Sequence, residues 1–209
     1  MPHIGPYTLH AIETGRFGLD GGAMFGIVPT PLWSTRIEPD AQNRIPLSMR
    51  CLLLKGHGRV VLVDTGIGDT FEDTKYQSLY AVDHSDATLA ESLHDCGVAP
   101  ADVTDVVLTH LHFDHCGGGT QRTDAGAEPT FPNATYHVQR QHWDWATDPN
   151  PKEKGSFLSE TFAPLERSDQ LHLVDGAGQL FPYVDVALVH GHTESQQVVT
   201  VHDETTTLV

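Results

Sequence analysis

Short apolar runs separated by turns dominate the first part of the chain and predict β-strands. Tyr7 to Glu13 roughly alternates apolar and polar side chains, which is typical of a strand with one buried face. Cys51 to Leu54 and Val60 to Val63 are β-type runs on either side of Gly56-His57-Gly58, so they predict a hairpin. Between these regions, Leu19 to Pro31 is rich in Gly and Pro and predicts an ordered loop.

The middle of the chain changes to helical spacing. In Ser85 to Cys96, apolar side chains recur at i, i+4 and i+7 from Leu89, Ser85 can serve as the N-cap, and Gly97 follows the last turn. The run Asp105 to Thr109 then predicts a short buried strand. The remaining elements are predicted as a helix at Gln139 to Ala146 and strands at Thr135 to Val138, Leu171 to Val174, Val184 to Val189 and Gln197 to His202.

This mixed order of strands and helices predicts an α/β fold. The chain shows no internal repeat, no low-complexity tract and no linker, and its 209 residues are the size of one domain. We therefore expect residues 1–209 to form a single domain, long enough to bury a core without disulfide bonds.

Composition excludes several classes of protein. The chain has 12 Lys plus Arg and 28 Asp plus Glu, so its formal net charge of −16 disfavours binding to nucleic acid or to an anionic membrane. Its three cysteines, Cys51, Cys96 and Cys116, have no C-x-x-C spacing and predict reduced thiols in a cytoplasmic protein. The N-terminus lacks the pattern of a signal peptide, and the apolar runs are too short to cross a bilayer.

Histidine is unusually abundant, with 14 residues, and three of them fall within six positions. In His110-Leu111-His112-Phe113-Asp114-His115, residues i and i+2 of an extended backbone point the same way, so His110 and His112 can hold one ion. Asp114 and His115 follow on a turn and can face a second ion. Imidazole and carboxylate together suit zinc, and also Mn, Fe or Co. Gly117-Gly118-Gly119 then lets the chain leave without side-chain crowding.

A catalytic zinc typically needs three protein ligands and one open position. His192 is predicted as the third ligand, because it follows the strand that ends at Val189 and lies in His190-Gly191-His192-Thr193. His190, at the end of that strand, is interpreted as structural.

These motifs together resemble those of the metallo-β-lactamase superfamily. The resemblance rests on Asp64-Thr65-Gly66 after a strand, on His110 to His115, and on His190 to Thr193 after a later strand. The stretch Leu19 to Gly26, followed by Pro29 and Leu32-Trp33, is similar to the branch that holds the N-acyl homoserine lactonases and the methyl parathion hydrolases.

The resemblance implies a fold and further ligands. The fold would be an αββα sandwich of two mixed β-sheets flanked by helices, with the metals at one edge. The family also has an Asp that bridges two metals and a final His on the second metal. Because the chain stops at Val209, inside the strand expected to precede that Asp, we expect both ligands and the C-terminal part of the sandwich to lie beyond Val209. Asp203 is rejected as the bridging residue, since it falls in the turn before that strand.

The implied function is that of a zinc-dependent hydrolase of the lactonase or esterase type, with two ions in the complete protein. A metal-bound hydroxide would attack a lactone or ester, an N-acyl homoserine lactone among the candidates, and Asp114 would be the catalytic residue that orients the nucleophile. Two alternatives stay open: an organophosphate or aryl-ester hydrolase of the same fold, and a non-catalytic metal-binding module. The expected partner is a small-molecule substrate, and a homodimer is left open.

Several other side chains have competing interpretations. Asp64 is interpreted as a residue that holds the histidine loop rather than as a ligand, and Cys116 as a small residue packed beneath that loop. Substrate contact and ordinary packing stay equally open for Met24, Phe25 and Trp33. Trp143 and Trp145 cannot share one helix face, so at most one of them is expected in the core. Three further histidines have no potential ligand at a suitable spacing in the sequence, and they are interpreted as surface or packing residues: His137, His142 and His172.

Overall fold

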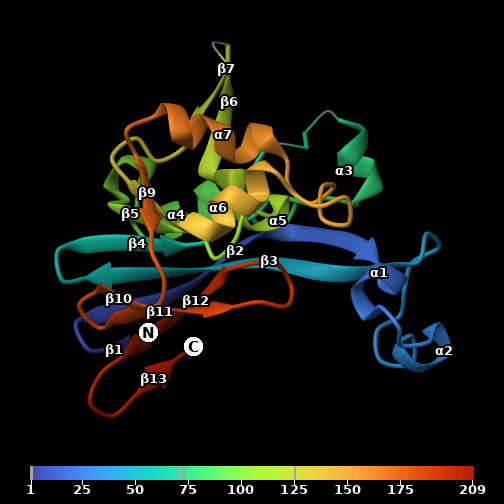
Figure 1. The fold of residues 1–209 in the computed structure, drawn as a ribbon, viewed down its shortest axis with the longest axis horizontal. Helices are drawn as coiled ribbons and strands as arrows, with labels where there is room; N and C mark the ends of the chain where they lie inside the picture. Colours follow the sequence, from blue (N-terminus) through green and yellow to red (C-terminus); the bar gives the residue numbers. More distant parts are fainter. Residues whose placement is uncertain (1, 70, 73, 125) are drawn as a thin grey trace.

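In the computed structural model, which describes residues 2–69, 71–72, 74–124 and 126–209, two β-sheets face each other (Figure 1). The larger sheet consists of β1 (His3–Ile4), β2 (Tyr7–Asp20), β3 (Arg44–Gly56), β4 (Arg59–Val63), β5 (Asp105–Val107), β8 (Thr135–Gln139) and β9 (Leu171–Val174), in that order. The smaller sheet consists of β10 (Gly178–Phe181), β11 (Val184–Val189), β12 (Gln196–His202) and β13 (Thr207–Leu208). A separate hairpin is formed by β6 (Thr120–Thr123) and β7 (Gly126–Pro129).

The larger sheet is mixed, as predicted. Its first four strands pair antiparallel, whereas β4, β5, β8 and β9 run parallel to one another. The described strands of the smaller sheet pair antiparallel. Because β4, β5 and β8 are parallel, their carboxyl ends meet at one edge of the sheet, where α/β proteins commonly bind ligands.

Each face of the larger sheet has its own apolar core. Successive strand residues point to opposite faces, so Val106 and Val107 enter different cores. The face that carries Val106 packs against the helices α4 (Leu89–Asp95), α6 (Arg140–Thr147) and α7 (Ser159–Arg167) through Leu93, Trp143, Phe162 and Leu165. The face that carries Val107 packs against the smaller sheet through Phe181, Val184 and Val201. Because this alternation puts apolar side chains on both faces of the larger sheet, both faces must be covered. Helices cover one face, and the smaller sheet covers the other.

Most predicted strands are confirmed, including the hairpin of β3 and β4 around Gly56-His57-Gly58 and the strand pair β11 and β12. The predicted start of the helix at Ser85 is wrong. The helix α4 begins at Leu89, because the Thr88 hydroxyl accepts a hydrogen bond from the Glu91 amide and donates one to the Glu91 carboxylate. This reciprocal cap places the N-cap at Thr88, three residues later than predicted.

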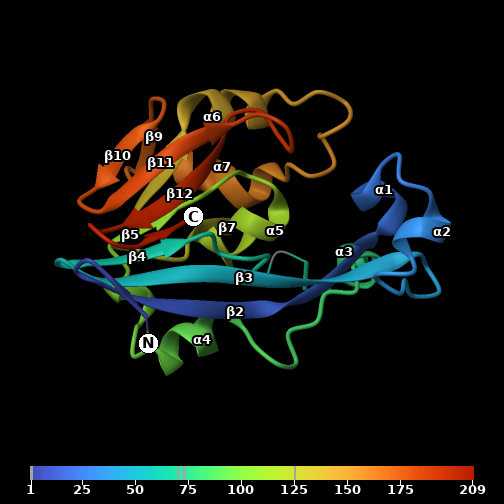
Figure 2. The ribbon, with the colours of Figure 1, turned by 90° about the horizontal axis from the view of Figure 1, so that it is seen from below.

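The prediction of a loop over Leu19 to Pro31 is also wrong. The strand β2 continues to Asp20, whose side chain caps the short helix α1 (Gly21–Phe25), and a second short helix, α2 (Thr30–Trp33), has Pro31 in its first turn. A proline there removes no helical hydrogen bond, which explains why this segment can be helical. Figure 2 shows α1 and α2 at the far end of the long β2 and β3 strands.

Besides α1 and α2, three helices and four strands of the described residues were not predicted: α3 (Lys75–Leu79), α5 (Phe113–Cys116) and α7, and β1, β6, β7 and β10. The helix α7 contains Pro164, which breaks the expected helical pattern. The other helices, α3 and α5, are too short to show a period, and β10 is a four-residue strand. None of the helices in the described residues is long and apolar enough to cross a membrane.

A partly buried ion pair between Arg59 and Asp105 lies at the start of β5, at the edge of the larger sheet opposite the carboxyl ends of β4, β5 and β8. The Asp105 carboxylate accepts hydrogen bonds from Arg59 at 2.7 Å and from the Thr104 hydroxyl at 2.7 Å, and lies 2.9 Å from the His137 ring. Burial alone would raise the pKa of Asp105, but these hydrogen bonds outweigh it and hold the pKa below 3.8. The ionised carboxylate therefore stabilises the fold above pH 3.8, and this contribution is lost as the pH falls through the folded-state value.

We expect Asp105→Asn to lower the free energy of unfolding by about 1–3 kcal/mol at neutral pH, because it weakens a buried charge-assisted network. Below pH 3.8 the difference between the variant and the original chain should shrink. Urea denaturation of the metal-free chains at pH 7 and pH 3 measures both values, and a difference that stayed constant across this range would contradict the assignment.

Candidate metal centre

The predicted histidine motif lies at the carboxyl end of β5. His110 and His112 follow this strand, with His112 in extended backbone, and α5 then carries Asp114 and His115 on a single turn. His110 and His112 are buried, with 1% and 6% of their surfaces exposed, and their ring centres lie 4.6 Å apart. A short helix thus replaces the predicted turn, and it brings the His115 ring to 4.0 Å from the His110 ring.

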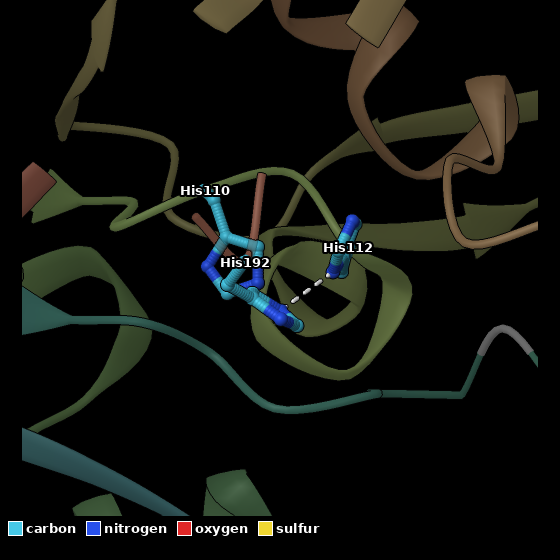
Figure 3. A group of neighbouring side chains, drawn as sticks. All are labelled: His110, His112 and His192. Carbon is cyan, nitrogen blue, oxygen red and sulfur yellow. Dashed lines mark hydrogen bonds between the residues drawn. The ribbon is translucent and has the colours of Figure 1, made fainter. Parts of the chain in front are cut away.

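The loop between β11 and β12 brings His192 to the same place. One nitrogen from each of His110, His112 and His192 lies within 4.8 Å of the others, and Figure 3 shows the three rings converging from two distant segments. His112 Nδ1 and His192 Nε2 are 3.1 Å apart. Two imidazole nitrogens bound tetrahedrally to one zinc at about 2.0–2.1 Å would be separated by about 3.3 Å. His192 is exposed, so the cluster opens to solvent on its side.

The carboxylate of Asp64 orients two of the histidines. Its Oδ1 accepts the Thr109 amide at 2.8 Å, and its Oδ2 accepts the Thr109 hydroxyl at 2.8 Å. Oδ2 also lies 2.8 Å from His115 Nδ1, and a carboxylate can only accept there. Since Thr109 donates its one hydroxyl proton to Asp64, it must accept from His110 Nδ1, which lies 3.0 Å away.

This hydrogen-bond chain leaves a free lone pair at His110. With the ring proton on Nδ1, His110 Nε2 is an acceptor, and it is buried with no partner among the described residues. Burial, followed by the neighbouring His115 and His112, lowers the pKa of His110 well below its usual value. Burial also lowers the pKa of His112 to about 3. Both rings are therefore neutral at pH 7, the form that binds a metal, so this donor set fits a divalent cation.

Asp114 and His115 form a second pair of donor atoms. His115 Nε2 lies 3.4 Å from an Asp114 carboxylate oxygen, and His115 Nδ1 is already occupied by Asp64. Burial opposes protonation of His115, but the Asp64 carboxylate outweighs it and raises the pKa of His115 to about 9 in the metal-free chain. Burial also raises the pKa of Asp114. A cation could hold the same two atoms in place of the His115 proton.

The turn that carries these groups fits tightly against the segment after β4. The Thr65 amide donates to the His115 carbonyl at 2.8 Å, and the Gly118 amide donates to Gly66. A Cβ atom on Gly118 would lie 2.3 Å from the Thr65 carbonyl oxygen, and one on Gly117 would lie 2.3 Å from that of Ile67. Glycine is thus required here because two backbones touch.

His142 is a residue whose place the sequence did not reveal. It lies on α6 and is completely buried, with hydrogen bonds to the Leu111 amide at 2.8 Å and to the Glu194 carbonyl at 2.6 Å. Of the other two histidines without a spacing partner, His137 is buried and His172 is exposed. No side-chain spacing could have indicated His142, because its partners are backbone groups.

Other predicted residues lie outside the cluster. His190 is half exposed and contacts Glu194 at 2.8 Å, and Cys116 is fully buried beneath the loop, where burial raises the pKa of its thiol to about 12. Asp203 accepts hydrogen bonds from the amides of Gly5, Thr205 and Thr206, so it is a turn residue.

The tryptophans and the Gly-rich stretch divide between core and surface. Trp143 is buried and Trp145 is not, as their spacing predicts. Trp33 is buried and stacks on Phe25 with ring centres 5.1 Å apart, whereas Met24 is 44% exposed.

Comparison with known proteins agrees with this fold. Residues 46–209 match the family described as the metallo-beta-lactamase superfamily. An N-acyl homoserine lactonase from Bacillus cereus is 27% identical over 176 residues, which cover 80% of this chain and 63% of that protein. The chain thus spans less than two thirds of the length of that relative.

Solved structures show the same architecture. A crystal structure of a probable metal-dependent hydrolase from Staphylococcus aureus superposes with a TM-score of 0.88 and 28% identity, covering 99% of this chain and 72% of that one. AidC, described as a dizinc quorum-quenching lactonase in complex with a product, superposes with a TM-score of 0.79 and 19% identity, covering 99% of this chain and 71% of that one. With the predicted fold thereby confirmed, the chain belongs to the metallo-β-lactamase superfamily.

Proposed function

We propose that this chain carries the metal centre of a hydrolase that opens lactones or cleaves esters, with N-acyl homoserine lactones as the first substrates to test. The observation that supports it most strongly is the convergence of His110, His112 and His192, with an unpartnered, buried lone pair on His110. The names of relatives support the substrate class, since the Bacillus cereus relative is an N-acyl homoserine lactonase.

In this proposal, each side chain has a distinct task. His110, His112 and His192 hold the first cation, and Asp114 and His115 contribute to a second. Bound divalent cations of this kind supply Lewis acidity toward a carbonyl oxygen and a nucleophile near neutral pH. Asp114 orients the attacking water and can hold its proton on a carboxylate oxygen. Phe157 lies against the His112 ring at 4.7 Å and excludes water from that side.

The proposal predicts tightly held metal and metal-dependent hydrolysis. Freshly purified protein should contain at least one zinc-class ion per chain, and chelation should abolish hydrolysis of N-hexanoyl homoserine lactone until zinc is restored. Metal analysis and ring opening followed by pH-stat measure the two quantities, with an aryl ester and a phosphotriester assayed in parallel. Less than about one ion per ten folded chains would contradict the metal centre. Faster turnover of the phosphotriester than of the lactone would instead indicate an organophosphate hydrolase.

Substitution of the ligands should separate the two cations. His112→Ala should abolish turnover and weaken the first metal. Asp114→Ala should chiefly lower the occupancy of the second metal and reduce the turnover number by about 10²-fold or more. His190→Ala is the matched control, because His190 lies on the same loop as His192 but outside the cluster. Full metal load and unchanged turnover in Asp114→Ala would show that Asp114 has no role at the site.

The orienting role of Asp64 has its own test. In Asp64→Asn, the amide nitrogen cannot accept from Thr109 or His115, so metal affinity or activity should fall by about 10–100-fold. Asp203→Asn should leave both unchanged, because Asp203 accepts its hydrogen bonds from a surface turn and from Gly5, away from the histidine cluster. Equal metal affinity in the two variants, measured by competition with a chelator, would contradict the proposed role of Asp64.

A further inference from the structure

One buried side chain, that of His142, contacts both of the loops that carry the three histidines. His142 lies between them, on the first turns of α6, and none of its surface is exposed. Its Nε2 is 2.8 Å from the amide nitrogen of Leu111, the residue between His110 and His112. Its Nδ1 is 2.6 Å from the carbonyl oxygen of Glu194, two residues after His192.

These two contacts determine the state of the ring. A backbone amide can only donate and a backbone carbonyl can only accept, so Nε2 is the acceptor and Nδ1 carries the proton. Both nitrogens of His142 are thereby used, and neither is available to a cation. The ring acts as a rigid spacer between backbone groups that are 83 positions apart in the sequence (Leu111 to Glu194).

Other hydrogen bonds also hold the His192 loop. Just after it, the Gln197 amide donates to the Thr109 carbonyl at 2.9 Å, and His192 Nε2 lies 3.1 Å from His112 Nδ1. Residues 190–195 form no regular structure, and His192 itself is exposed. The Thr193 hydroxyl donates to Glu153 at 2.7 Å, and the Ser195 hydroxyl donates to Gln141 at 3.0 Å. Neither the Thr193 nor the Ser195 hydrogen bond contacts the histidine motif. His142, in contrast, joins the His192 loop directly to the backbone between His110 and His112.

We propose that His142 is a positioning residue that sets the distance between His192 and the pair His110 and His112, so that three nitrogens can bind one cation together. The inference rests on the metal centre of the proposed function. Ligands must be held within about 0.5 Å of the productive geometry, so release of either loop should weaken the cation even though His142 does not touch it. A merely structural role would instead lower stability and leave metal affinity unchanged.

Three substitutions separate the two contacts. In His142→Gln, the side-chain amide reaches the position of ring Nε2 and can accept from the Leu111 amide. In His142→Asn, the side-chain amide lies near the position of Nδ1 and can donate to the Glu194 carbonyl. His142→Leu keeps neither hydrogen bond. His137→Leu is the matched control, because His137 is also a buried histidine with two ring contacts, to Asp105 and His172, away from both loops.

The experiment measures Co²⁺ affinity of the metal-free chains by chelator competition, together with the visible absorption of the bound cobalt and the melting temperature. We expect His142→Leu to bind cobalt about 10–100-fold more weakly, with an altered spectrum, and His142→Gln and His142→Asn to lose less affinity. His137→Leu should lose stability but no cobalt affinity.

The possible outcomes separate the positioning role of His142 from the existence of the metal centre itself. If the original chain binds cobalt and His142→Leu binds it within twofold with the same spectrum, the positioning role is overturned. If His142→Leu does not fold, unchanged affinity and spectrum in both the Gln and the Asn variants overturn it equally. If the original chain binds no cobalt, the proposed metal centre fails, and the positioning role fails with it.

Discussion

One carboxylate, that of Asp64, connects the fold to the chemistry of the candidate site. It orients His115 directly and His110 through the Thr109 hydroxyl, so one anion determines which nitrogen of each ring is free. Asp64 itself has a positive φ of 59° at the end of β4, and its amide donates to Val107 of the neighbouring strand. The larger sheet therefore positions the Asp64 carboxylate, and this carboxylate orients one metal-binding ring nitrogen for each of the two proposed cations.

The mixed topology explains how residues far apart in the chain reach this carboxylate. The parallel strands β4 and β5 end side by side, which places Asp64 next to the turn that carries the histidine motif. The second sheet brings the loop with His192 onto the same edge, where Gln197 of β12 donates to the carbonyls of Leu108 and His137 in the larger sheet. Burial then keeps the His110 and His112 rings neutral. A site open on the side of His192 combines a low-dielectric interior with access for a small substrate.

Sequence reasoning succeeded where the signal is local and failed where it is not. The short apolar runs and the Gly turn predicted the strands, and the i, i+2 spacing of His110 and His112 indicated two rings on one side. The helix start at Thr88 was missed although Thr88-x-x-Glu91 is present, because Ser85 offered an earlier cap. The role of His142 left no pattern to read, since its partners are the backbone groups of Leu111 and Glu194, brought together only by tertiary structure.

Anomalous diffraction tests most directly whether the histidines on the two loops form one cation site. Crystals of the zinc-loaded chain, measured at the zinc absorption edge, should show a peak at about 2.0–2.1 Å from one nitrogen each of His110, His112 and His192. A weaker second peak should lie against Asp114 and His115. A map with no peak at the three histidines, from protein shown to contain stoichiometric zinc, would contradict the account.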